Sequence, residues 1–139
     1  MDSAIEAFTI GKDRELDLLL APHDILGSMA HVLMLESIGL MDKEELPPVY
    51  TALQELYARS LEPDFVIEEG IEDIHSQVEL MLTSKLGDLG KKIHSGRSRN
   101  DQVLLDLKLF SRARLEELVV KADQLADTLL GKANSIKRS

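Results

Sequence analysis

The sequence predicts an all-α fold, on three observations: its composition, the spacing of its apolar residues and the residues that can end helices. Of its 139 residues, 44% are hydrophobic but only 4% are aromatic. Most of the hydrophobic residues are Leu, Ile, Val, Met and Ala, a composition that favours helices over strands. Apolar residues also recur every three or four positions, as on one face of a helix. The length is that of one ordinary domain.

The first helical pattern covers residues 17–40. Ile25, Met29, Val32 and Leu33 recur at helical spacing there. Pro22 lies within this stretch, and because proline lacks an N–H group we expect it to kink or divide the helix.

A second helix is predicted over residues 49–62, entered through Pro47 and Pro48. Two adjacent prolines cannot lie in the middle of a helix, so they mark its entrance. The next stretch, EPDFVIEEG at 62–70, is interpreted as a loop or a short strand. The apolar residues of the second helix that recur at helical spacing are Tyr50, Leu53, Leu56, Tyr57 and Leu61.

A third helix is predicted from Asp73 to Leu86. Asp73 is a favourable N-cap residue and Gly87 a favourable C-cap residue. The segment that follows, GDLGKKIHSGR at 87–97, is predicted to be a loop.

The last helix is predicted from Asn100 to Gly131, because the stretch between them holds neither Gly nor Pro. At 1.5 Å per residue it would be roughly 45 Å long, more than a compact domain of this size needs. Two apolar stripes predict burial among several neighbours, as at the centre of a helical bundle. One stripe holds Val103, Leu107, Phe110, Leu118, Leu125 and Leu129, and the other Leu105, Leu109, Ala113, Val120, Ala122 and Ala126.

Charge and composition exclude several classes of function. The net charge of −9 argues against nucleic acid or an anionic membrane as the main partner, since both need a basic surface. Without cysteine, neither a disulfide nor a thiolate metal site is possible. No stretch approaches the roughly 20 apolar residues that span a bilayer, and the N-terminus does not resemble a signal peptide. We therefore expect a soluble, cytoplasmic protein.

Basic residues gather in one short segment of this acidic chain. Lys91, Lys92, Arg97 and Arg99 fall within nine residues that include no acidic residue. A run of this kind on its own is usually a solvated basic loop, so a second feature is needed to predict a site.

The start of the last helix supplies that feature. Ser98 and Asp101 are spaced as a capping box with Asp in place of Glu, so the helix begins near them. Unpaired N–H groups at a helix N-terminus, flanked by Arg97 and Arg99, suit a carboxylate or a phosphate. Gly96 lets the backbone approach closely. The segment therefore predicts an anion site without identifying the anion.

The same segment resembles a known family. HSGRSRNDQV at 94–103 is similar to the HTGRSRNDQV signature of argininosuccinate lyases, which belong to the fumarase/aspartase superfamily. EDIHSQVELMLTSKLGDLGKKIHSG at 72–96 resembles that family's EDIH run, and DLLLAPHDILGSMAHVLML at 17–35 resembles its D..L..YDI.GS.AHA.ML segment. The resemblance extends from about Asp17 to Asp127. It implies an N-terminal helical domain over 1–98 and, over 99–139, the start of a central helical bundle.

The resemblance implies a reversible β-elimination that splits argininosuccinate into arginine and fumarate, a step of arginine biosynthesis, without a cofactor. In this reaction a base removes a proton beside a carboxylate, and the guanidinium nitrogen then leaves. The family is homotetrameric and builds each active site from more than one subunit. By motif match, the substrate-binding residues would be Asp17, Asp73, Ser98, Arg99 and Asn100.

His75 and Arg97 would support these residues, His75 from just behind Asp73. Asp73 on its own pattern is an ordinary N-cap, and the match to the family gives it the binding role. Glu72 and His75 have the spacing of a helical metal pair, but two ligands are too few, and we expect no metal. His31 and His94 are interpreted as hydrogen-bonding residues rather than catalysts.

Two family signatures are absent: the THLQ.AQP segment with the acid/base histidine and the GSS.MP.K.NP loop with the serine base. We therefore expect no catalytic residue in this chain and no activity from it alone. The LWGGRF-like opening is also absent, and Asp13 stands where the family usually has a serine. The alternative is a non-catalytic helical assembly or anion-binding module, like the lens crystallins of this family that have lost activity.

Overall fold

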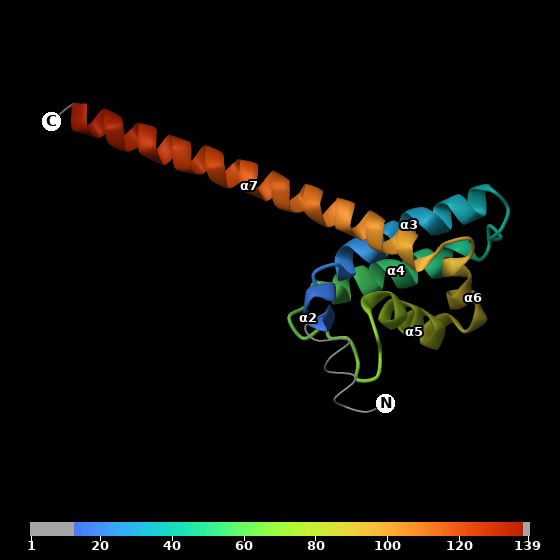
Figure 1. Cartoon of the computed structure of the whole chain (residues 1–139). Helices are drawn as coiled ribbons and strands as arrows, with labels where there is room; N and C mark the ends of the chain where they lie inside the picture. The colour runs from blue at the N-terminus through green and yellow to red at the C-terminus, as the bar shows by residue number, and fades with distance from the viewer. Residues whose placement is uncertain (1–12, 138–139) are drawn as a thin grey trace. The chain divides into compact units, whose positions relative to one another are not determined.

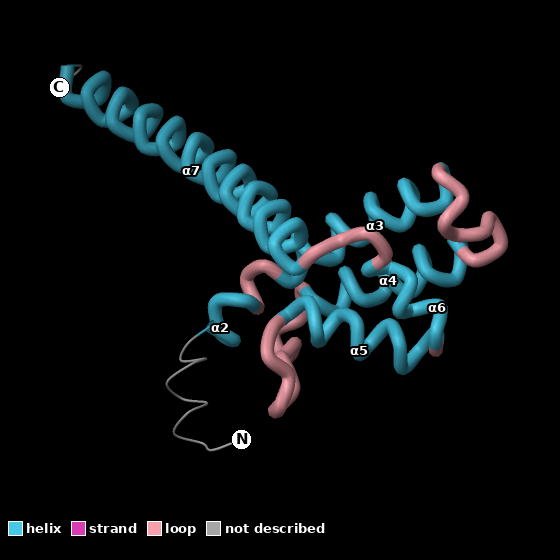
Figure 2. Tube along the Cα trace, turned by 45° about the vertical axis from the view of Figure 1, so that its right-hand side comes forward, coloured by secondary structure: helices cyan, strands magenta, loops and turns pink. Residues whose placement is uncertain are grey.

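The computed structural model describes residues 13–137, and every regular element in this range is helical, which confirms the all-α prediction (Figure 1). Loops join the helices along the Cα trace (Figure 2). The chain divides into two compact units, Met1–Leu107 and Lys108–Ser139. The elements are α2 (Asp13–Asp17), α3 (Ala21–Ser37), α4 (Leu46–Ser60), α5 (Ile74–Leu86), α6 (Asp88–Lys91), the 3-10 helix η1 (Lys92–His94) and α7 (Arg99–Lys137).

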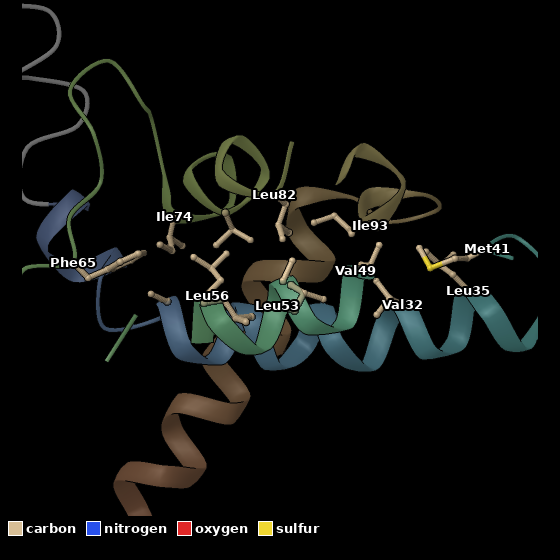
Figure 3. Packing of buried hydrophobic residues seen from close by; sticks show 14 residues of the cluster. Val32, Leu35, Met41, Val49, Leu53, Leu56, Phe65, Ile74, Leu82 and Ile93 are labelled. Carbon is tan, nitrogen blue, oxygen red and sulfur yellow. The ribbon is translucent and has the colours of Figure 1, made fainter. Parts of the chain in front are cut away.

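The core of the first unit forms where α3, α4 and α5 pack against one another. Figure 3 shows Leu53 of α4 and Val32 of α3 in this cluster, with Ile74 and Leu82 projecting from α5. Ile93 of η1 and Phe65 of the loop before α5 are also buried there. Burying a side chain such as Leu or Ile stabilises a fold by about 1.5 to 3 kcal/mol, so these three helices hold the unit together.

Proline marks helix starts at two places. Pro22 lies in the first turn of α3, and a turn at 18–20 separates α3 from α2, so the predicted division of the first helix is confirmed. Pro47 and Pro48 also lie inside the first turn of α4, which begins at Leu46. The predicted start at residue 49 was therefore wrong by three residues. First-turn N–H groups have no partner within the helix, so prolines are tolerated there.

The third helix has the predicted ends. Asp73 is the N-cap of α5 and accepts a hydrogen bond from the backbone N–H of Ser76 at 2.8 Å. Gly87 ends the helix with a φ of +61°. The stretch before it, 62–70, forms a loop, and the alternative of a short strand is wrong for these described residues. Phe65 is buried and Val66 exposed, but a strand needs a neighbouring strand for its hydrogen bonds.

The segment 87–97 was predicted to be a loop, and for residues 88–94 this is wrong, because they form α6 and η1. The misleading residue was Gly90. A Cβ atom at Gly90 would lie 2.7 Å from the carbonyl carbon and oxygen of Leu82 in α5. Glycine therefore serves here for close packing of α6 on α5, and not for a turn.

The last helix begins at Arg99 and continues through Gly131 to Lys137, beyond its predicted end. Gly131 sits in open space, so nothing there forces the helix to stop. The described part of the second unit is this one helix, so the predicted burial of both apolar stripes is not seen within that unit. Leu118 and Leu125, for example, are 60% and 61% exposed. No helix among the described residues is long and apolar enough to cross a membrane.

Candidate functional site

Arg99, the first residue of α7, contacts the first turn of α5. Its Nε lies 3.2 Å from Oδ2 of Asp73, and its Nη2 donates a hydrogen bond to the Ser76 hydroxyl at 3.1 Å. The side chains of Arg99 and Asp73 are 44% and 21% exposed. The two helix starts therefore present an accessible ion pair at which a charged ligand could exchange with either partner.

Asp17, at the end of α2, meets the same turn. Its Oδ2 accepts a hydrogen bond from the backbone N–H of Ile74, the first residue of α5, at 3.2 Å. Asp17 and Asp73 thus both place a carboxylate at the positive end of α5, where the helix dipole favours negative charge. Three residues predicted from the sequence, Asp17, Asp73 and Arg99, are brought together around one helical turn.

Ser98 and Asp101 form the predicted capping box. The backbone N–H and hydroxyl of Ser98 each donate to Oδ2 of Asp101 at 2.9 Å, and the N–H of Asp101 donates to the Ser98 hydroxyl at 3.3 Å. These hydrogen bonds from Ser98 keep the pKa of Asp101 below its ordinary value. The Ser98 side chain is thus engaged in starting α7, whereas Asn100, in the first turn, is exposed.

Two histidines hold the loop that precedes α7. The Nε2 of His31 in α3 hydrogen-bonds to the carbonyl of Ser95 at 2.9 Å. The buried amide of Gln102 donates to Nδ1 of His94 at 3.2 Å, and Nε2 of His94 lies 3.5 Å from a carboxylate oxygen of Glu79. Burial lowers the pKa of both histidines. Their contacts fit hydrogen-bonding residues that orient the loop.

Behind the ion pair lies a buried cluster of three ionisable side chains from three helices. Asp24 of α3, His75 of α5 and Asp106 of α7 are 0%, 2% and 0% exposed. Nδ1 of His75 is 2.9 Å from Oδ1 of Asp24 and 3.7 Å from Oδ2 of Asp106. Burial, together with the charge of Asp24, raises the pKa of Asp106 to about 7, although His75 and Arg97 act in the opposite direction.

Arg97 reaches toward this cluster from the loop. Its Nη1 donates to the hydroxyl of Ser28 at 3.3 Å, while its Nη2 is buried without a hydrogen-bond partner. Burial lowers the pKa of Arg97, and the charges of Asp24 and Asp106 oppose that shift. The predicted supporting residues His75 and Arg97 therefore belong to one buried group rather than to the exposed pair.

The three ligand atoms of Asp24, His75 and Asp106 lie within 4.8 Å of one another, a grouping that could hold a cation. The metal pair considered from the sequence was Glu72 with His75, but Glu72 is exposed and is not in this group. Nδ1 of His75 already hydrogen-bonds to Asp24, and the positive charge of Arg97 acts on both carboxylates. Both features favour a proton over a metal ion in the cluster.

Comparison with known proteins gives the family. A family model described as lyase matches residues 2–138. The chain belongs to the lyase family. The chain is 61% identical to the argininosuccinate lyase of Parabacteroides distasonis over 137 residues, which is 99% of this chain and 31% of that protein. It is 62% identical to that of Bacteroides fragilis over 133 residues, covering 96% and 30% of the two chains.

A more distant relative shows the same limit of coverage. The argininosuccinate lyase of Methylococcus capsulatus is 43% identical over 117 residues, 84% of this chain and 25% of that protein. The chain thus spans about 30% of the length of these more similar relatives. The resemblance to argininosuccinate lyases that the motifs indicated is confirmed.

Asp24 and Asp106 were not identified from the sequence. A signal for them exists at helical spacing: Asp24 precedes the buried Ser28 by one turn, and Asp106 follows the buried Gln102 by one turn. Each pair places two polar residues on the buried face of its helix. Buried polar residues need partners, so such a pair predicts a buried polar contact between helices.

Proposed function

We propose that this chain supplies the N-terminal part of an argininosuccinate lyase, which reversibly eliminates fumarate from argininosuccinate to give arginine. Residues 1–98 form its N-terminal helical domain, and residues 99–139 open its central bundle. The complete enzyme acts in arginine biosynthesis in the cytoplasm as a homotetramer. The observation that carries this proposal is the meeting of Arg99, Asp73 and Asp17 at the starts of α5 and α7.

The charges at this meeting point match those of the substrate. Argininosuccinate carries carboxylates on its succinate part and a guanidinium group at the bond that breaks. Arg99 and the N-terminus of α7, with Asn100 in its first turn, suit a carboxylate. Asp17 and Asp73 are carboxylates that can bind the substrate guanidinium, and Asp73 would exchange its partner Arg99 for that group. The exposed ion pair exchanges its own partners for those of the ligand.

We propose that the side chains at the starts of α5 and α7 do not act as the base that removes a proton from carbon, because Asp73 is paired with Arg99 and Asp17 accepts a hydrogen bond from the first backbone N–H of α5. Arginine stays protonated at neutral pH. The hydroxyl of Ser98 donates to Asp101, and the hydroxyl of Ser76 accepts from Arg99. General acid–base catalysis typically contributes about 100 to 10,000-fold. We therefore propose that this chain binds and orients substrate and that the acid and the base come from other segments of the enzyme.

A chimera tests the proposal. The matching segment of the Parabacteroides distasonis argininosuccinate lyase is replaced by this chain, and fumarate production from argininosuccinate is followed by absorbance. We expect the assembled chimera to turn over substrate and this chain alone to give no fumarate. In the chimera, Asn100→Ala should lower kcat/KM by about 100-fold, a typical loss for one donor at a developing charge.

The matched control is Gln54→Ala, an exposed amide in α4 that is not among the proposed binding residues, which should leave kcat/KM unchanged. Sedimentation establishes that each chimera has assembled. An assembled chimera without turnover would favour the non-catalytic module. Fumarate release by this chain alone would overturn the assignment of roles, because His75 or His94 would then have to act as the base.

A further inference from the structure

Three helices each place one ionisable side chain at a single buried point of this chain, and two of the three are acidic. Asp24, His75 and Asp106 are all at most 2% exposed. Neither oxygen of Asp106, nor Oδ2 of Asp24, has a hydrogen-bond partner among the described residues. Buried carboxylates without partners are costly when charged, so the cluster must lower its negative charge in some way.

Arg97 offsets only one of the two carboxylates. If both were ionised and His75 were neutral, the four side chains would carry one net negative charge in a buried place. Further acidic groups face the same point from neighbouring elements, and His94 stays neutral because burial lowers its pKa. One bound proton makes the cluster neutral. The groups that act on it are Asp17 of α2, Asp24 of α3, Asp73 and His75 of α5, Arg97 of the loop and Asp106 of α7.

The distances around His75 indicate which atoms can hold that proton. Nδ1 of His75 lies between Oδ1 of Asp24 at 2.9 Å and Oδ2 of Asp106 at 3.7 Å. A hydrogen on Nδ1 bonds to Asp24, and Asp106 either faces the resulting imidazolium or carries the proton itself. In both arrangements the proton offsets the charge of one carboxylate, and the positive charge of Arg97 offsets that of the other.

The cluster and the exposed ion pair share the same two helices. His75 lies between Asp73 and Ser76, the two residues that contact Arg99. Asp106 lies two turns after Arg99 on α7. Helices α5 and α7 are thus joined twice, by Arg99 at the surface and by His75 with Asp106 two turns further along α7.

Close packing makes this buried join sensitive to small changes. A Cβ atom at Gly27 of α3 would lie 2.8 Å from Cδ2 of Leu105 and 3.8 Å from Oδ1 of Asp106. Helices α3 and α7 therefore approach each other directly at the cluster. Repulsion between two charged carboxylates here acts on the helix that begins with Arg99.

We propose that Asp24, His75 and Asp106 share one proton, and that this proton positions the starts of α5 and α7 so that Arg99 and Asp73 form the anion site. Asp24 and Asp106 are thereby positioning residues. The inference deepens the proposed function, on which it rests, because the site being positioned is the proposed substrate site. Loss of the shared proton drives the carboxylates apart and weakens anion binding.

The pKa directions agree with this placement. Burial raises the pKa of Asp106 to about 7. Burial acts to lower the pKa of His75, but the hydrogen bond that its Nδ1 donates to Asp24 and the charges of Asp24 and Asp106 outweigh burial and raise that pKa overall. The folded cluster therefore holds a proton that the unfolded chain has already released near neutral pH. Its contribution to folding stability falls as the pH rises from the ordinary pKa of 3.8 for Asp106 to the folded value of about 7.

The test compares the unmodified chain with Asp106→Asn, which cannot ionise, at pH 6 and pH 8. Urea unfolding is followed by circular dichroism and fumarate binding by NMR. We expect the unmodified chain to lose stability and to bind fumarate about tenfold more weakly at pH 8, the loss that one proton can cause per pH unit. Asp106→Asn should show a much smaller change in both. Asp42→Asn, an exposed carboxylate, is the matched control and should follow the unmodified chain.

The two readouts separate the inference from the proposed function. If fumarate fails to bind at either pH, the proposed anion site is wrong, while the pH dependence of unfolding still tests the shared proton. Equal pH dependence in the unmodified chain and Asp106→Asn would overturn the inference.

Two further measurements use the unmodified chain and do not depend on whether a variant folds. The imidazole ¹⁵N resonances of His75 in the unmodified chain should titrate above the ordinary histidine value of about 6.5, and titration at or below that value would overturn the inference. Zinc chloride added at pH 7 should leave these resonances in place. Stoichiometric zinc binding that shifts them would instead assign the cluster to a metal ion.

Discussion

Nε of Arg99 lies 3.2 Å from Oδ2 of Asp73, so the residue that begins α7 is paired with the residue that caps α5. The pair joins two segments that lie 26 positions apart in the sequence. Each partner is only partly exposed, and each also contacts Ser76. Arg99 donates a hydrogen bond to the Ser76 hydroxyl, and Asp73 accepts one from the Ser76 backbone N–H. A ligand carrying both a carboxylate and a guanidinium group can replace each partner by a group of the same charge.

The first prediction concerns competition for Arg99. Asp73→Asn should strengthen fumarate binding by this chain, because it removes the carboxylate that occupies Arg99 while retaining a side chain that can cap α5. Arg99→Ala should abolish the chemical-shift changes that fumarate causes. Asp64→Asn, which breaks the exposed pair with Arg59, changes the net charge equally and serves as the control. Unaltered fumarate shifts in Arg99→Ala would place the anion site elsewhere.

The second prediction concerns the start of α7. Ser98→Ala should lower the free energy of unfolding by about 1 kcal/mol, the typical cost of losing an N-cap side chain. The reason is that the Ser98 hydroxyl makes two of the hydrogen bonds with Asp101. Urea unfolding measures the change. Ser95→Ala, an exposed serine of the same loop, should change the free energy by less than about 0.5 kcal/mol, and an equal loss in both variants would contradict the capping role.

Helix ends could be predicted from the sequence because their causes are local. Asp73 as N-cap, Gly87 as C-cap and Ser98 with Asp101 as a capping box each depend on residues within one turn. The predicted anion site at residues 96–101 was recognised for the same reason, because its residues are adjacent in the sequence. Pro47 misplaced a boundary by three residues, because the first turn of a helix accepts proline as readily as the position before it.

What could not be predicted depends on contacts between distant segments. Gly90 signals a turn when considered alone, and its close approach to Leu82 becomes visible only once α6 lies on α5. Asp24 and Asp106 lie 82 positions apart, and a single buried acid in an apolar helix does not indicate its partner. The pairing of Arg99 with Asp73 was likewise inaccessible from spacing, although both residues had been assigned to one site by family resemblance.

The third prediction compares two helical glycines. Gly90→Ala should destabilise the first unit by about 1 to 3 kcal/mol, because its new Cβ would overlap the backbone of Leu82. Gly131→Ala meets nothing within 4 Å and should raise helix content, since Ala is favoured over Gly within a helix by about 1 kcal/mol. Urea unfolding measures the first change and circular dichroism the second. A stabilised Gly90→Ala would show that α6 does not pack closely on α5.

The fourth prediction concerns the second unit, whose described part is one helix over residues 108–137. Its own side chains support the helix through the pairs of Arg112 with Glu116 and Arg114 with Glu117, at 3.0 and 2.9 Å. Such pairs stabilise a helix by only about 0.2 to 0.5 kcal/mol each, and most of the stability of helices in proteins comes from packing of their apolar faces. The persistence of this helix in solution therefore requires its apolar residues to be covered.

A second copy of the chain can provide that cover, and we expect the protein to self-associate at micromolar concentration. Leu118, Leu125 and Leu129 recur at intervals of seven and four on one face and are each about 60% exposed. Burying such a leucine contributes about 1.5 to 3 kcal/mol, enough for a few of them to hold helices together. Sedimentation velocity should show a dimer or a larger oligomer that dissociates on dilution.

Two double variants test whether the apolar face is responsible. Leu118→Glu with Leu125→Glu should give a monomer with reduced helix content, because charge on the contact face disfavours its burial. Gln124→Glu with Thr128→Glu adds the same charge at exposed polar positions of the same helix and should leave the oligomer intact. Dissociation in both variants would assign the effect to net charge rather than to the leucine face. A monomeric unmodified chain that keeps its full helix content would show that the exposed leucines need no partner, because the helix would then persist without one.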